Sequence, residues 1–264
     1  MTREKLTLIL LALMTAAPLW ASETVLISGF DPFGGSSDNN SWRIAQALRA
    51  ELPEVNIVTC LLPTSYARSM PALEECLKTL PAPPDLLISL GEGPCRVKWE
   101  TRAHNRDHDR GPDNDGVSRR RRTIDPTGPR ELGLRLNYAA MWCALEESEK
   151  KLVQVSTSPD NFVCNHTAYR TGLMLPEMVY GFVHVPSTRC ESQAPGITTA
   201  AVKLVAKMIR TQLATLDSHS SRIEWPTRQN SVRLASEVRD VRALRSEASE
   251  TCETEFLQQW IRGF

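Results

Sequence analysis

A cysteine and a histidine of this chain occur in settings that suit thiol chemistry. Cys164 lies in the segment Phe162–His166, and His184 lies in the segment Gly181–Pro186, which begins seventeen residues after the cysteine. A thiolate beside an imidazole is a nucleophile for acyl carbon atoms, and the imidazole carries the proton. The spacing alone leaves the ordinary alternative open, because small buried cysteines and structural histidines are both common in compact domains.

The helix and strands predicted around Cys164 and His184 indicate how these two side chains could come together. Residues 165–175 have the composition of a helix that ends before Pro176, so Cys164 would lie at a helix N-terminus, where free backbone N–H groups favour an anion. Apolar residues at 152–155 and 179–183 predict buried strands ahead of the cysteine and the histidine. If these strands are neighbours that end at the same edge of a sheet, they bring Cys164 and His184 together.

Strand and helix patterns alternate along most of the chain. The predicted strands also include 24–28, 55–62, 85–90 and 97–103, and the further predicted helices are 41–52, 69–80, 138–150 and 198–216. Residues 106–133 are polar and predict a long loop, of a length that often carries function. The alternation predicts an α/β fold, namely a three-layer α/β/α sandwich with a mostly parallel (mixed) open central sheet, plus a C-terminal helical tail.

Composition and charge limit the classes of partner. The 264 residues are 41% hydrophobic and 23% charged, and the formal net charge is zero. This balance is typical of a globular protein with a full core and gives no sign of nucleic acid binding. We expect the basic run Arg119–Arg122 to be a solvated face or a lid segment. The glycine-rich loop 29–35 lacks the features of nucleotide-binding loops, and His104 and His108 lack a third ligand, so neither a cofactor nor a metal is predicted.

The N-terminus predicts a secretory signal peptide. Arg3 and Lys5 precede an apolar run at residues 6–14, and small residues follow as far as a cleavage site after Ala21. The run is too short to favour a membrane span, so we expect no stable membrane insertion once the signal is removed. The mature protein is therefore expected to be secreted, or periplasmic in a Gram-negative host.

The cysteine count agrees with that location. All seven cysteines follow the predicted signal, where disulfides form in an oxidising compartment. An odd number leaves at least one thiol free or in an intermolecular bridge. We expect Cys164 to be the free thiol, whereas the sequence does not determine how the other six pair: Cys60, Cys76, Cys95, Cys143, Cys190 and Cys252.

The composition changes near residue 217. Ser, Arg and Glu become frequent from there, and 232–244 and 253–261 are predicted amphipathic segments. The expected organisation is a signal peptide at 1–21, a main domain at 22–216 and a partly helical extension at 217–264. The extension could cover a sheet edge, support a homo-oligomer or contact a partner, and the sequence does not choose among these.

Several segments of the chain resemble the pyroglutamyl peptidase I family of cysteine peptidases. Residues 25–35 resemble the family's opening strand and its Gly-Phe-Glu-Pro-Phe-Gly-Gly loop, and residues 97–116 resemble its glutamate segment. Residues 162–166 and 181–186 resemble its nucleophile and histidine motifs. The matches occur in the family's order and cover about residues 24–210.

The resemblance implies a triad of Cys164 as nucleophile, His184 as base and Glu100 as orienting carboxylate. Arg110 corresponds to an arginine that helps to stabilise the oxyanion. The residues that correspond to the family's lactam pocket are Phe30, Phe33, Phe162 and Val163. The implied activity is that of an exopeptidase that removes N-terminal pyroglutamate from a peptide through a thioester, with no cofactor.

Departures from the family pattern keep two other functions open. Gly111 replaces an isoleucine, residues 91–95 differ from Gly-Gln-Ala-Gly-Gly, and residues 158–161 replace a Ser-Ala-Gly-Thr type of loop. One alternative is an amidohydrolase of the same fold with altered acyl specificity. The other is a non-catalytic binding or scaffold protein in which Cys164 is held in a disulfide.

Overall fold

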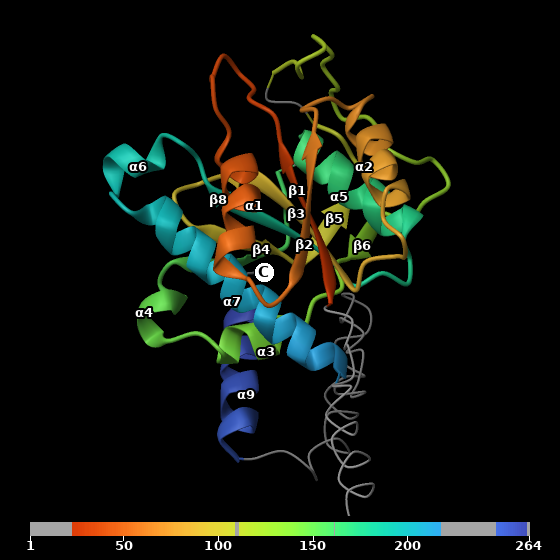
Figure 1. Ribbon diagram of the computed structural model, residues 1–264. Helices are drawn as coiled ribbons and strands as arrows, with labels where there is room; N and C mark the ends of the chain where they lie inside the picture. The colour runs from red at the N-terminus through yellow and green to blue at the C-terminus, as the bar shows by residue number, and fades with distance from the viewer. Residues whose placement is uncertain (1–22, 109–110, 161, 218–246, 263–264) are drawn as a thin grey trace, which may run out of the picture.

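The computed structural model describes residues 23–108, 111–160, 162–217 and 247–262 (Figure 1). The predicted signal peptide, Arg110 and the predicted segment 232–244 lie outside the described residues.

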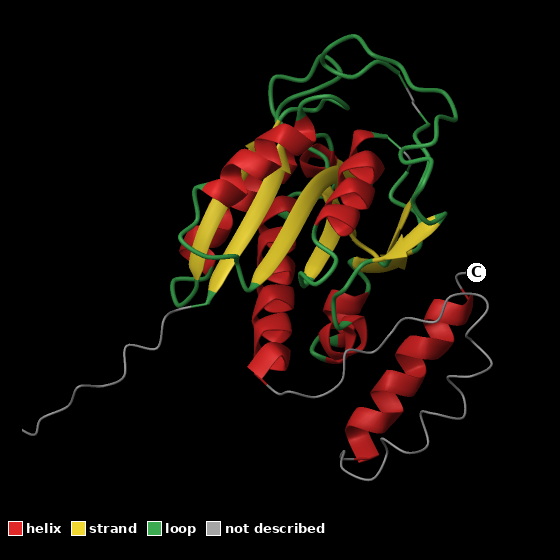
Figure 2. Cartoon of the chain, turned by 90° about the vertical axis from the view of Figure 1, so that its right-hand side faces the viewer, coloured by secondary structure: helices red, strands yellow, loops and turns green. Residues whose placement is uncertain are grey.

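A six-stranded mixed sheet forms the middle layer. Its strands, in spatial order, are β2 (Asn56–Leu62), β1 (Thr24–Phe30), β3 (Leu86–Gly93), β8 (Tyr180–Pro186), β4 (Val97–Glu100) and β7 (Val153–Ser156). The first four are parallel, whereas β4 and β7 are parallel to each other and antiparallel to β8. The long loops, including the one that follows β1, gather at one end of this sheet (Figure 2).

Helices cover both faces of the sheet. One face packs against α1 (Asn40–Glu51), α7 (Ile197–Asp217) and α3 (Tyr138–Cys143), and the other packs against α2 (Ser69–Lys78) and α5 (Val163–Met174) (Figure 1). The prediction of a three-layer α/β/α sandwich with a mostly parallel sheet is confirmed.

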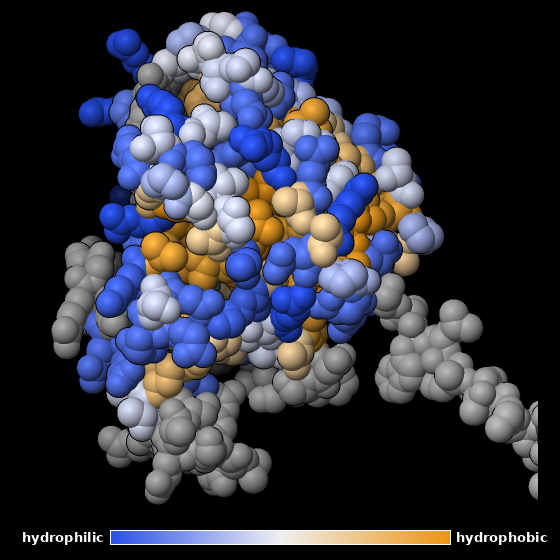
Figure 3. Space-filling view, turned by 60° about the vertical axis from the view of Figure 1, so that its left-hand side comes forward, coloured by the Kyte–Doolittle hydropathy of each residue, from blue (hydrophilic) through white to orange (hydrophobic). Residues whose placement is uncertain are grey.

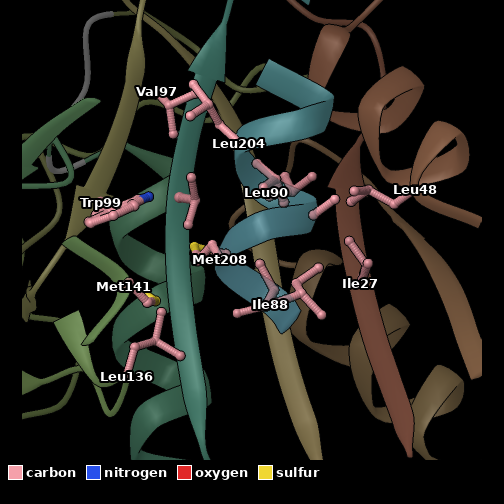
Figure 4. Packing of buried hydrophobic residues seen from close by; sticks show 14 of the residues in the cluster. Ile27, Leu48, Ile88, Leu90, Val97, Trp99, Leu136, Met141, Leu204 and Met208 are labelled. Carbon is pink, nitrogen blue, oxygen red and sulfur yellow. The ribbon is translucent and has the colours of Figure 1, made fainter. Parts of the chain in front are cut away.

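Successive residues of a strand point to opposite faces of the sheet, so each face has its own hydrophobic core. In β1, Val25 and Ile27 join the core under α1 and α7, whereas Leu26 joins the core under α2 and α5. Figure 4 shows the first of these cores, in which Ile88 and Leu90 of β3 pack beside Met208 of α7. Burial of each such side chain stabilises the fold by roughly 1.5–3 kcal/mol relative to exposure.

Two predicted elements are each divided in the structure. The predicted strand 97–103 is wrong as one element, because the chain leaves the sheet after Glu100, and β5 (Arg102–His104) pairs instead with β6 (Glu131–Gly133), which lies within the predicted loop. The predicted helix 138–150 is wrong as one element too. The first helix, α3, ends at Cys143. A separate helix, α4 (Glu147–Lys150), begins at Glu147, because Glu146 and Glu149 form a capping box.

The predicted neighbour relation of the strands before Cys164 and His184 is wrong as well. β4 lies between β7 and β8, and β7 runs opposite to β8. The two side chains are therefore not brought together by two parallel strand ends. Cys164 instead comes to His184 from the first turn of α5.

Three disulfides pair the other six cysteines, and Cys164 is free, as predicted. Cys60–Cys76 joins β2 to α2, and Cys95–Cys190 joins the turn after β3 to α6 (Cys190–Gln193). Cys143–Cys252 joins α3 to α9 (Glu247–Arg262). In α9, Phe256 is fully buried, and its ring centroid lies 6.2 Å from that of Trp142. Part of the C-terminal extension is therefore docked on the main domain.

The surface is mostly hydrophilic in the view that brings the left of Figure 1 forward, with apolar atoms visible between polar ones (Figure 3). Within the described residues, no helix combines the length and the apolar character that a membrane crossing requires.

The docking of α9 predicts a stability difference between two adjacent residues. Phe256→Ala should lower the free energy of unfolding by about 3 kcal/mol, because it leaves a cavity against Trp142. Leu257→Ala is the matched control, since Leu257 is 36% exposed, and its effect should stay within about 0.5 kcal/mol. Urea unfolding of the oxidised protein measures both. Equal effects of the two substitutions would show that α9 is not packed in this way.

Candidate active site

A buried histidine–carboxylate pair lies between β8 and β4. Nδ1 of His184 lies 2.8 Å from Oε1 of Glu100, and the two side chains are 2% and 0% exposed. The antiparallel pairing places Lys98 opposite His184 and Glu100 opposite Phe182, so the carboxylate reaches back diagonally to the imidazole. Because Nδ1 is engaged by Glu100, Nε2 is the ring nitrogen left for another partner.

Cys164 supplies that partner from the first turn of α5. Its thiol lies near the imidazole of His184 and acts on the pKa of that ring both as a hydrogen-bonding group and through its charge. Phe162, at the N-cap position, makes no side-chain capping bond, so the backbone N–H groups of the first turn are not capped by that side chain. The predicted helix is confirmed, with a start at Val163 that places Cys164 within the helix.

Glycines of β3 make room for this arrangement. A Cβ atom on Gly91 would lie 2.9 Å from Sγ of Cys164, and one on Gly93 would lie 2.8 Å from Cβ of His184. Both distances are too short for real contacts. β3 can therefore pass beneath the thiol and the imidazole only with glycine at these positions.

The electrostatic state of His184 follows from its neighbours. Burial lowers the pKa of the imidazole, but the hydrogen bonds to Cys164 and Glu100, and the negative charges of both groups, raise that pKa to about 10. The cationic imidazolium is therefore the favoured form of His184 at neutral pH. A thiolate–imidazolium pair is the reactive state of cysteine nucleophiles.

A small, open pocket ends at Cys164. All four residues that the resemblance assigned to the lactam pocket line it, together with Asn39, Thr64, Glu92 and the thiol: Phe30, Phe33, Phe162 and Val163. The rings of Phe33 and Phe162 lie 6.3 Å apart, centroid to centroid. Such a space suits a small, flat, uncharged group held by aromatic walls and a few polar atoms.

Asp31 holds in place the loop that follows β1 and carries Phe33. Its Oδ1 accepts hydrogen bonds from the backbone N–H of Thr64 at 2.7 Å and from Nδ2 of Asn114 at 3.0 Å. Nδ2 of Asn114 also donates to the carbonyl of Pro32 at 2.8 Å. The loop after β1 and Thr64 line the pocket, and Asn114 supports that loop from outside the lining.

Two departures from the family pattern, at Gly111 and in residues 158–161, include backbone positions with positive φ. Gly111 has φ of +149°, which a side chain would strain, and it does not line the pocket. Asp160, just before the nucleophile, has φ of +69°, a left-handed conformation that Asp tolerates better than most residues. Arg110 lies outside the described residues, so its predicted oxyanion role stays a prediction.

Sequence reasoning missed two charged residues at the site. Nζ of Lys98 lies 3.0 Å from Oε1 of Glu100, and Glu92 lines the pocket beside Cys164. A signal existed for the first of them, because Lys98 and Glu100 are two residues apart in a strand whose other residues are apolar, and positions two apart share one face of a strand. Glu92 also had a signal, because it lies in residues 91–95, which differ from the family's Gly-Gln-Ala-Gly-Gly segment.

The residues after Cys164 have structural roles. The side chain of Asn165 accepts a hydrogen bond from the backbone N–H of His104 at 2.7 Å and donates to the carbonyls of His104 and Arg106 at 2.9 Å. His166 bonds Asp107 through Nδ1 at 3.1 Å, and Arg119 reaches the same carboxylate at 2.9 Å. These contacts join the start of α5 to the segment around β5.

His104 and His108 are not brought together as a metal pair. Nε2 of His104 lies 2.8 Å from the carbonyl of Thr157, a contact with the loop before the nucleophile. Over the described part of the chain, no group of three His, Cys, Asp or Glu side chains could hold a metal ion.

Comparison with known proteins agrees with this geometry. The sequence model of the pyroglutamyl peptidase family matches residues 23–210. The pyrrolidone-carboxylate peptidase of Bacillus velezensis is 32% identical over 218 residues, which cover 76% of this chain and 95% of that protein. The pyrrolidone-carboxylate peptidase of Streptomyces coelicolor is 36% identical over 169 residues, or 61% of this chain and 77% of that protein.

Solved structures show the same fold. Pyroglutamyl peptidase I of Bacillus amyloliquefaciens aligns with a TM-score of 0.63 and 27% identity, over 73% of this chain and 98% of that one. The pyrrolidone carboxyl peptidase of Thermococcus litoralis aligns with a TM-score of 0.66 and 25% identity, over 78% of this chain and all of that one, at 100%. From the family match and these relatives, the chain belongs to the pyroglutamyl peptidase family of cysteine peptidases.

Proposed function

We propose that the protein is a secreted cysteine exopeptidase that hydrolyses the bond after an N-terminal pyroglutamyl residue. The observation that supports this most directly is the free thiol of Cys164, which lies beside the buried His184–Glu100 pair and at the end of an aromatic pocket. Nucleophile, proton carrier and orienting carboxylate are the three groups that acyl transfer by a thiol needs.

In the proposed first step, Sγ of Cys164 attacks the exocyclic carbonyl carbon of the pyroglutamyl residue. Backbone N–H groups of the first turn of α5 stabilise the oxyanion. The C–N bond then breaks, His184 gives its proton to the departing amine, and the acyl group stays on sulfur as a thioester. Glu100 holds the imidazole in place during this transfer.

In the second step, water attacks the thioester. Neutral His184 takes a proton from the water, the C–S bond breaks, and free pyroglutamate leaves as the thiolate–imidazolium pair forms again. Atoms balance with one water consumed and one amine released, and no step needs a metal or an organic cofactor.

The pocket also indicates why a lactam suits this site. A pyroglutamyl ring is flat and uncharged, so it can lie against the aromatic wall that Phe33 and Phe162 form, without leaving a cation buried. Glu92 supports the alternative of altered acyl specificity, because a carboxylate lines the pocket where the family has an amide. The non-catalytic alternative required Cys164 in a disulfide, and its thiol is free.

Secretion is part of the proposal. Its support is the basic, apolar and small-residue pattern of residues 1–21, together with three disulfides of the kind that persist in oxidising compartments.

The substrate proposal predicts release of a fluorescent amine from its pyroglutamyl amide. Cys164→Ala should lower kcat/KM by about 1,000-fold or more, because no other group supplies the nucleophile. The prolyl amide of the same amine is the matched control, since its ring nitrogen is cationic and the ring carries no lactam carbonyl. Faster turnover of the prolyl amide would support altered specificity and contradict pyroglutamyl specificity.

The raised pKa of His184 predicts the alkaline limb of the pH profile. Because the pKa lies near 10, the imidazolium persists as the pH rises, and kcat/KM should fall only as the pH passes about 10. Glu100→Gln removes a negative charge from the imidazolium and should move this fall to lower pH by about 1 unit or more. An unchanged alkaline limb in Glu100→Gln would contradict the assigned role of the carboxylate.

Secretion predicts processing in a Gram-negative bacterial host. The full chain should accumulate in the periplasm with Ser22 as its first residue, as N-terminal sequencing of the purified protein would show. A chain in which Leu8, Leu10 and Leu13 are changed to Asp should stay in the cytoplasm, because the apolar run is broken. Unprocessed wild-type protein in the cytoplasm would contradict secretion.

A further inference from the structure

A buried lysine contacts the catalytic carboxylate. Lys98 lies two residues before Glu100 on β4, and its side chain is only 10% exposed. Its ammonium lies 3.0 Å from Oε1 of Glu100, the same oxygen that contacts Nδ1 of His184 at 2.8 Å. One carboxylate oxygen therefore has two cationic neighbours when His184 is protonated.

The same ammonium contacts the segment that leads to the nucleophile. Nζ of Lys98 donates to the carbonyl of Ser158 at 2.8 Å. Ser158 is also joined to Ser156, the last residue of β7, because its backbone N–H donates to the Ser156 hydroxyl at 3.1 Å. Lys98 thus connects Glu100 to the loop that ends at Cys164.

Burial of an ammonium is costly, so packing alone does not explain lysine at this position. The catalytic cycle does supply a reason. When His184 gives up its proton, Glu100 loses its cationic partner while it stays fully buried. A second cation 3.0 Å away gives the carboxylate a charged partner and keeps it oriented through that step.

We propose that Lys98 is a positioning residue of the active site, which holds the carboxylate of Glu100 and the loop before Cys164 in place. This inference rests on the catalytic roles given above to Cys164, His184 and Glu100. Lys98 acts through Glu100 and does not line the pocket, so it does not touch the substrate.

The charged groups around His184 determine the expected pH effect. Glu100 and Lys98 face it from β4, and the Cys164 thiol faces it from α5. On β3, positions 91 and 93 are glycines, and Glu92 between them binds the backbone N–H groups of Asn40 and Thr188. Removal of the Lys98 cation therefore leaves a more negative site, in which protonated forms are favoured.

The test is the pH dependence of two reactions in Lys98→Gln, which keeps a donor and removes the charge. Iodoacetamide alkylation reports on Cys164 alone, because the other six cysteines are in disulfides. Turnover of the pyroglutamyl amide is the second reaction. We expect the rise of both profiles with pH, and the alkaline fall of the turnover profile, to move to higher pH by about 1 unit. We also expect kcat to fall by about 10- to 100-fold, with KM within about twofold of wild type.

Three further variants make the result specific. Lys98→Arg keeps the cation and should restore the wild-type pH profile, and Lys98→Met provides a second neutral variant if Lys98→Gln does not fold. Lys207→Met is the control, because it removes a lysine that pairs with Glu149 at 2.6 Å, on α7 and away from the site. It should leave both profiles unchanged.

Profiles of folded Lys98→Gln or Lys98→Met that coincide with wild type would overturn the inference, as would an equal shift in Lys207→Met. A failure of the proposed function would give a different result from a failure of the inference about Lys98. In that case the wild-type protein does not cleave the amide, while its alkylation profile still shows whether Lys98 acts on Cys164 and His184.

Discussion

The buried carboxylate of Glu100 is the group on which the rest of the site depends. A carboxylate at 0% exposure is tolerated only beside compensating groups, and here both contacts converge on Oε1: His184 at 2.8 Å and Lys98 at 3.0 Å. These contacts require β4 to run antiparallel to β8 in a sheet whose central strands are parallel. The mixed sheet therefore places the carboxylate of Glu100 beside His184, the proton carrier. This contact contributes to the raised pKa of His184.

The nucleophile reaches this pair from the helical layer. α5 packs on the opposite face from α1 and α7, and its first turn brings Cys164 over Gly91 of β3. The pocket walls come from loops at the same end of the sheet, where Asp31 joins the loop after β1 to Thr64 and Asn114. The chemistry is thus built on rigid elements, while selectivity for the acyl group depends on loops that are held by a few hydrogen bonds.

The disulfides and the C-terminal helix add to this arrangement without entering it. Cys143–Cys252 spans 109 residues and Cys95–Cys190 spans 95, so both close long loops of the unfolded chain, where cross-links restrict its entropy most. Phe256 extends the core around Trp142 from outside the region that the family model matches. These features lie away from Cys164, which stays the free thiol.

The sequence by itself determined the layered α/β class, the free cysteine and the residues that meet at the site. Period and turn chemistry specify strands and helices locally, and the FVCNH and GFVHVP segments resemble a known family closely enough to identify Glu100 and the pocket phenylalanines. It did not determine the strand order. β4 lies between β7 and β8, because pairing between strands depends on contacts far apart in the chain that no local pattern encodes. For the same reason, the sequence did not reveal the disulfide partners or the contacts of Lys98 with Glu100 and Ser158. Only the tertiary structure decided which side chains share a buried, low-dielectric space, and that sharing sets the charge of His184.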